Sequence, residues 1–135
     1  MPSILYVDDE TPLRRAVQAW LGHRGVSVVT ARSVEDAIAV LAAEPVDGAF
    51  VDLWLVDGSG FELYAHIGEH YPALAPNVAF ITGDIVPAET TATQLAMFGR
   101  PVLFKPFDLS ELDRYVRRWR GESDVDAAGG GSTPA

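Results

Sequence analysis

The sequence of 135 residues contains no cysteine, and Lys105 is its only lysine. The missing cysteine excludes disulfide bonds, thiol catalysis and thiolate metal sites. No hydrophobic run approaches the length of a membrane span, and no basic segment precedes the first hydrophobic residues, so we expect no signal peptide. We therefore expect a cytoplasmic protein.

Positive charge is also scarce, because ten basic residues face nineteen acidic ones and the formal net charge is −9. Such a surface repels the phosphates of nucleic acids. The one basic cluster comprises Arg114, Arg117, Arg118 and Arg120. We interpret it as a solvated face near the C-terminal end of a helix, where cations are favourable. We expect neither a nucleic-acid partner nor a membrane partner.

Hydrophobic residues make up 48% of the sequence, which is sufficient for one core. The pattern of structured segments ends near Arg120. Residues 121–135 include four glycines and almost nothing to bury. We therefore predict one domain over residues 1–120, followed by a flexible tail or linker stub over residues 121–135.

Five apolar segments alternate with five helical patterns, which predicts an α/β fold with a doubly wound parallel sheet. The predicted strands are residues 3–7, 26–30, 48–53, 77–82 and 101–104. The predicted helix starts are marked by Thr11 as an N-cap before Pro12, by Ser33, by Ser59 with Glu62, by Pro87 with Glu89, and by Asp108 with Glu111. Gly25 and Gly99 are the expected C-terminal glycines of the first and fourth helices.

Polar residues stand at the ends of four predicted strands. They are Asp8 and Asp9 after the first, Asp52 after the third, Thr82 after the fourth and Lys105 after the fifth. In an open parallel sheet, ligands bind at the carboxyl ends of the strands. A lysine ammonium is a compact charge suited to a phosphate. The arrangement predicts that Asp52 accepts a phosphoryl group at this edge.

In this order, the residues resemble the receiver domain of two-component response regulators over about residues 3–119. The resemblance implies a CheY-like, flavodoxin-like (βα)5 fold with strand order 2-1-3-4-5. It also implies that Asp52 takes the phosphoryl group from a phosphohistidine of a histidine kinase or a histidine phosphotransfer protein. The domain would then bind a downstream protein partner or relay the phosphate.

The same resemblance assigns roles to individual residues. Asp9, Asp52 and the backbone carbonyl of Trp54 would ligate Mg²⁺ directly, with Asp8 holding a bound water. Lys105 would pair with Asp52 and then with the phosphoryl oxygens. A further implication is that Thr82 donates its hydroxyl to the phosphoryl group as the switch, and that the bond from Lys105 to Pro106 is cis.

Some positions depart from the family pattern. Val102 stands where many receivers have an aromatic ring, so the coupling of the threonine to that ring is replaced or weakened. Val56 stands where many have proline. Residues 99–107 and 57–60 look most like receivers attached to hybrid histidine kinases. Trp54 and Asp84 border the path of an attacking water, and a bulky indole there predicts slow self-dephosphorylation.

Other functions fit less well. Residues 66–70 match the H-x-x-E-H zinc protease pattern, but a glycine interrupts it and no third ligand is in view. A phosphatase of the haloacid dehalogenase type needs Asp-x-Asp after the first strand, whereas this sequence has Asp8-Asp9-Glu10 there. A nucleotide site needs a phosphate-binding glycine loop at the same point, and the sequence has none. The alternative from another class is a receiver-like binding module that works independently of phosphorylation.

Overall fold

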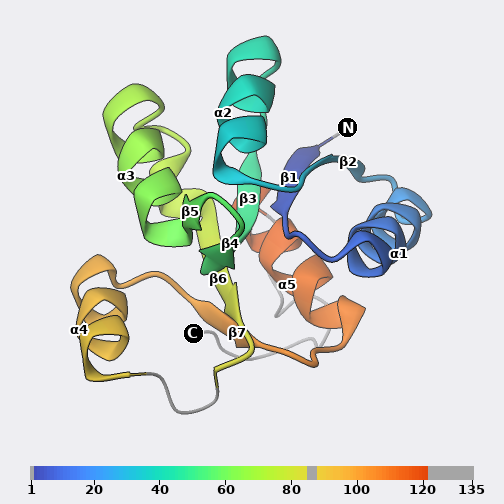
Figure 1. Ribbon diagram of the computed structural model, residues 1–135. Coiled ribbons are helices and arrows are strands. Elements are labelled where there is room, and N and C mark those ends of the chain that lie inside the picture. Colours follow the sequence, from blue (N-terminus) through green and yellow to red (C-terminus); the bar gives the residue numbers. More distant parts are fainter. Residues whose placement is uncertain (1, 85–87, 122–135) are drawn as a thin grey trace.

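Five parallel strands form the central sheet of the computed structural model, which describes residues 2–84 and 88–121 (Figure 1). The strands are β1 (Ser3–Val7), β2 (Ser27–Ala31), β3 (Gly48–Asp52), β6 (Val78–Thr82) and β7 (Val102–Phe104). Their order is β2-β1-β3-β6-β7, with parallel pairing at every ladder. This confirms the predicted order 2-1-3-4-5. Of the predicted tail, residues 122–135 lie outside the described residues, as does Pro87.

Among the residues that the structure describes, five helices cover the two faces of the sheet. They are α1 (Thr11–Gly22), α2 (Val34–Ala43), α3 (Gly60–His70), α4 (Glu89–Phe98) and α5 (Leu109–Trp119), and a short 3₁₀ helix η1 (Ala75–Asn77) precedes β6. Helices α1 and α5 pack on one face, whereas α2, α3 and α4 lie on the other (Figure 1). None of the helices formed by the described residues combines the length and apolar character that crossing a membrane requires.

The double cover explains why the strands are apolar without alternation. All five residues of β3 are buried. Phe50 faces α5, with its ring 4.9 Å from the ring of Trp119, whereas Val51 belongs to the cluster under α2 and α3. The last residue of β3 is Asp52, so its carboxylate is carried on a strand that is buried along its whole length.

Most of the predicted helix boundaries are confirmed. Ser33 Oγ accepts the backbone N–H of Asp36. Capping boxes form between Ser59 and Glu62 and between Asp108 and Glu111. Gly99 closes α4 in the left-handed conformation, with φ of 64°.

The predicted N-cap of the first helix is wrong by one residue. Glu10 is the N-cap, and Thr11 is already helical; its hydroxyl accepts a hydrogen bond from Arg14 Nη2. The helix ends at Gly22 with His23 as the C-cap. Gly25, with φ of 83°, is the predicted C-terminal glycine. Its N–H donates to the Gly22 carbonyl at 3.2 Å, and the Val26 N–H donates to the Leu21 carbonyl at 3.1 Å, which is the pattern of a left-handed C-terminal cap.

A small hairpin that the sequence did not predict follows β3. It pairs β4 (Trp54–Leu55) with β5 (Gly58–Ser59) in antiparallel orientation. At its tip, Asp57 accepts the backbone N–H groups of Val34 at 2.8 Å and Glu35 at 2.9 Å. These donors belong to the first turn of α2, where N–H groups have no partner within the helix. The hairpin is thereby fixed to α2.

The capping role of Asp57 predicts a pH-dependent contribution to stability. The backbone N–H groups of Glu35 and Val34 lower the pKa of Asp57 below its ordinary value of 3.8. A carboxyl whose pKa falls on folding stabilises the native state above the unfolded pKa, and this contribution is lost as pH falls through the folded pKa. Asp57→Ala should therefore lower the urea midpoint at pH 7, and its difference from the wild type should shrink below pH 3.8.

The matched control is Glu69→Ala, which removes an exposed carboxylate near the end of α3. It should leave the urea midpoint at pH 7 nearly unchanged. An Asp57→Ala effect that is independent of pH would contradict the capping role of the charge.

Candidate functional site

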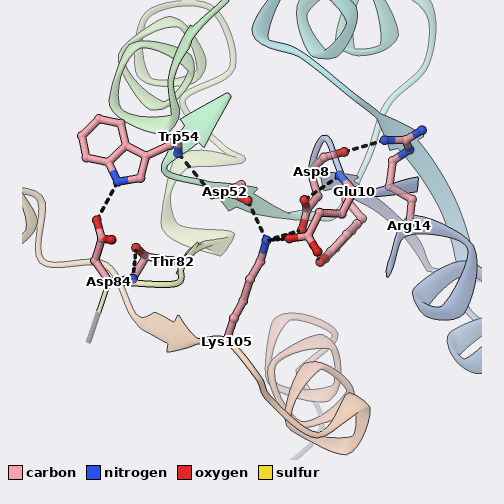
Figure 2. Close-up of polar contacts among 9 residues, drawn as sticks. Asp8, Glu10, Arg14, Asp52, Trp54, Thr82, Asp84 and Lys105 are labelled. Atoms are coloured by element: carbon pink, nitrogen blue, oxygen red, sulfur yellow. Dashed lines mark hydrogen bonds and ion pairs between the residues drawn. The ribbon is translucent and has the colours of Figure 1, made fainter. Parts of the chain in front are cut away.

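Four strand ends meet at one edge of the sheet and bring Asp8, Asp52, Thr82 and Lys105 together (Figure 2). Asp8 follows β1, Asp52 ends β3 and Thr82 ends β6. All three are buried. Lys105 follows β7, and its backbone N–H donates to the Thr82 carbonyl at 2.8 Å. The predicted cis peptide bond between Lys105 and Pro106 is confirmed.

The Lys105 ammonium lies among three carboxylates. Its Nζ is 2.9 Å from Asp52 Oδ2, 3.1 Å from Asp8 Oδ2 and 2.5 Å from Glu10 Oε2 (Figure 2). Glu10 was not among the predicted site residues. The sequence shows three acidic residues at positions 8–10, but it does not show that the Glu10 side chain points toward Lys105.

Asp8 is the most tightly held of the three carboxylates. Its Oδ2 accepts the Tyr6 hydroxyl at 2.9 Å, and its Oδ1 accepts the Glu10 backbone N–H at 3.0 Å. Burial, together with the charge and hydrogen bond of Asp8, raises the pKa of Tyr6, so the phenol stays neutral. Arg14 Nη1 adds a bond to the Asp8 carbonyl at 2.8 Å. The buried carboxylate therefore has fixed partners in the Tyr6 hydroxyl and the Glu10 N–H.

The charges of Asp52 and Lys105 support each other. Burial raises the pKa of Asp52, and the hydrogen bonds from Lys105 and from the Trp54 backbone N–H act in the opposite direction. Burial alone would lower the pKa of Lys105, but hydrogen bonds with Glu10, Asp52 and Asp8 raise it. The lysine is therefore a cation at neutral pH.

The carboxylates form a group that a divalent cation could occupy. Asp8, Glu10 and Asp52 each offer an oxygen within 4.8 Å of the others. An all-oxygen, negatively charged group suits a hard cation such as Mg²⁺. Asp9, a predicted ligand, is exposed and is not a member of this group. The backbone of Trp54 adjoins Asp52 through its N–H at 3.1 Å, and the role of its carbonyl stays a prediction.

The histidines of the H-x-x-E-H pattern lie elsewhere, on α3. The rings of His66 and His70 have centroids 4.4 Å apart. Within residues 2–84 and 88–121, neither histidine belongs to a group of three ligands that could hold a metal.

A hydrogen-bonded bridge crosses the site beside Thr82. Thr82 Oγ1 accepts the backbone N–H of Asp84 at 3.0 Å, and Asp84 Oδ2 accepts Trp54 Nε1 at 2.9 Å (Figure 2). The indole is 46% exposed and meets the edge of Phe61 at a centroid distance of 6.4 Å. Val102 pairs in register with Phe80 and packs against the core as a half-buried side chain.

Gly60 sets the distance between α3 and the end of β3. A Cβ atom at this position would lie 2.6 Å from the Asp52 carbonyl oxygen and 3.2 Å from Leu53 Cα. The Gly60 N–H donates to the Leu53 carbonyl at 2.8 Å. Only a residue without a side chain allows this approach of helix and strand.

Gly60→Ala should therefore destabilise the protein by about 1–3 kcal/mol, in the range of overpacked buried sites. Urea unfolding measures the change. Gly68→Ala on the same helix is the matched control, because nothing lies within 4 Å of its Cβ position; it should be neutral or stabilising by about 0.5–1 kcal/mol. Equal effects of the two substitutions would contradict the close approach at Gly60.

Comparison with known proteins identifies the family. A family model described as the response regulator receiver domain matches residues 4–117. The chain belongs to this family. It is 36% identical over 114 residues to the response regulator protein PilR of Pseudomonas aeruginosa, covering 83% of this chain and 24% of PilR. It is 31% identical over 127 residues to the autoinducer 1 sensor kinase/phosphatase LuxN of Vibrio harveyi, covering 94% of this chain and 14% of LuxN. The receiver domain thus spans about a quarter or less of these relatives.

Solved structures share the fold of this receiver domain. A two-component response regulator from Clostridium difficile superposes with a TM-score of 0.78 at 22% identity, covering 90% of this chain and 97% of that one. TrrA from Thermotoga maritima, in complex with Mg²⁺-BeF, gives 0.74 at 22% identity, with 88% and 99% covered. The predicted CheY-like, flavodoxin-like fold is confirmed, and the chain is a receiver domain of two-component signal transduction.

Proposed function

We propose that Asp52 accepts a phosphoryl group from a phosphohistidine of a histidine kinase or histidine phosphotransfer protein, in a reaction that requires Mg²⁺. The observation that carries the proposal is the Lys105 ammonium, 2.9 Å from Oδ2 of the buried Asp52 carboxylate. An Asp52 oxygen forms the new bond to phosphorus as the bond from phosphorus to the donor nitrogen breaks, and the imidazole keeps that electron pair. Lys105 then stabilises the phosphoryl oxygens.

The donor set supports a cation in this site. Asp8 and Asp52 lie together, and by resemblance Asp9, Asp52 and the Trp54 carbonyl are the direct ligands, with Asp8 acting through a water. When bound, Mg²⁺ offsets the negative charge that a phosphoryl group brings to a carboxylate. TrrA, which shares this fold, was solved in complex with Mg²⁺-BeF.

Thr82 is the proposed switch. Its Oγ1 accepts a hydrogen bond from the Asp84 N–H, which uses a lone pair and not the hydroxyl proton. That proton is the one donated to a phosphoryl oxygen. Because Val102 carries no ring, the change at Thr82 reaches α4 and α5 without an aromatic rotation at this position. Residues 1–120 form the unit that then engages a downstream protein partner or passes on the phosphate in the cytoplasm.

The acceptor is tested by intact mass after incubation with Mg²⁺ and acetyl phosphate. The wild type should gain one phosphoryl group, and Asp52→Asn should gain none. An adduct on Asp52→Asn would place the acceptor elsewhere. No adduct on either protein, with no change in tryptophan fluorescence on adding Mg²⁺ and beryllofluoride, would favour the phosphorylation-independent binding module.

The lifetime of the phosphoryl group is predicted to depend on the Trp54 indole. Bound to Asp84, the indole hinders the approach of water. Trp54→Ala should accelerate loss of the phosphoryl group roughly tenfold, equivalent to about 1.4 kcal/mol in the barrier. A time course of intact mass after removal of the donor measures the rate.

Two further variants separate bulk from hydrogen bonding. Trp54→Phe keeps a ring but lacks the Nε1 donor, and Asp84→Ala removes the acceptor. Both should give rates between those of the wild type and Trp54→Ala. Loss from Trp54→Ala as slow as from the wild type would rule out the indole as a barrier.

A further inference from the structure

Glu10 is the third carboxylate that contacts Lys105, beside the two buried aspartates. The distance from Lys105 Nζ to Glu10 Oε2 is 2.5 Å, compared with 2.9 Å to Asp52 and 3.1 Å to Asp8. The three contacts match the three N–H donors of an ammonium. Asp8 and Asp52 are fixed by burial at strand ends, whereas the Glu10 side chain is 55% exposed. Of the three carboxylates, that of Glu10 can therefore leave the ammonium with the smallest change in its exposure to water.

The backbone of Glu10 is fixed even though its side chain is exposed. Its N–H donates to Asp8 Oδ1 at 3.0 Å, and its carbonyl accepts the N–H of Arg14 at the start of α1. Glu10 is the N-cap of this helix, but its side chain makes no capping hydrogen bond. The Glu10 carboxylate thus binds Lys105 and does not cap the helix. Substituting Glu10 should therefore leave the start of α1 in place.

A hollow of about 350 Å³ adjoins the ion pair. Glu10, Leu13, Lys105, Pro106 and Phe107 line it. The Glu10 carboxylate therefore borders both the buried acidic group and open space. If the ammonium moves toward another anion, Glu10 can turn into this hollow and regain water.

We propose that Glu10 is a positioning residue that restrains Lys105 while Asp52 is unphosphorylated. This inference rests on the proposed function. The Glu10 charge has two opposing consequences. It adds to the attraction that the acidic group exerts on a divalent cation. It also competes with the incoming phosphoryl group for the ammonium and repels an anionic phosphodonor.

Two measurements should therefore move in opposite directions when the charge is removed. In Glu10→Ala, the dissociation constant for Mg²⁺, followed by tryptophan fluorescence without any phosphodonor, should rise about two- to fivefold, the range of a half-exposed charge. At saturating Mg²⁺, phosphoryl uptake from acetyl phosphate should be about two- to fivefold faster. A residue that only supports the fold would slow uptake and lower the melting temperature.

Glu10→Gln and Glu69→Ala complete the set. The glutamine keeps the length and can still accept a hydrogen bond, so it should weaken Mg²⁺ binding as the alanine does but accelerate uptake less. Glu69→Ala removes an equal charge from the far end of α3 and should change neither quantity.

The single lysine allows a direct readout. In protein labelled with ¹³C,¹⁵N-lysine, the side-chain Nζ and Cε signals belong to Lys105 alone. Without cation or donor, Glu10→Ala should shift these signals and speed exchange of the ammonium protons, whereas Glu69→Ala should not. Unchanged Lys105 signals, or uptake that is equal or slower in a folded Glu10→Ala protein, would overturn the proposal. If Asp52 does not accept a phosphoryl group, the wild type itself gains no adduct. That result is distinct from a failure of the Glu10 proposal.

Discussion

The ammonium of Lys105 is the interaction on which the rest of the site depends. Two carboxylates, those of Asp8 and Asp52, are buried at the ends of adjacent strands, and burying unpaired charges is costly. Lys105 is placed between them by the last parallel strand, whose neighbour in the sheet is β6. The order of the strands in the sheet therefore places one cation, at this edge, beside two anions from separate strands.

The surroundings divide into a fixed part and an adjustable part. Asp52 is carried by a fully buried strand, with Gly60 of α3 packed against its carbonyl. The hairpin that follows is fixed to α2 through Asp57. In contrast, Glu10 and Trp54 contribute exposed side chains from loops or short strands and reach the site through single hydrogen bonds. The proposed transfer to Asp52 would use both parts: a carboxylate held in a rigid position, and neighbours that can change partners.

The strand ends were predictable because they follow from patterns of several residues. Apolar runs placed Asp8, Asp52 and Thr82 at the carboxyl ends, and alternation with helices required these ends to meet. The contact of Glu10 with Lys105 was not predictable, since the direction of each acidic side chain depends on how the chain turns after β1. The bridge from Trp54 to Asp84 and the cap from Asp57 to α2 were also missed as contacts. Each joins residues at least 22 positions apart, and side-chain rotamers decide whether they meet.

The raised pKa of Lys105 has a chemical consequence for a domain of this kind. An aspartyl phosphate is an activated acyl group, and an unprotonated amine within about 3 Å could attack its carbonyl carbon, break the acyl C–O bond to release phosphate, and form an amide after losing a proton. That reaction would join Lys105 to Asp52 permanently and consume the site after one cycle. A protonated amine has no lone pair for the attack. By holding the proton on Lys105, the carboxylates would keep the proposed acceptor site available for further cycles.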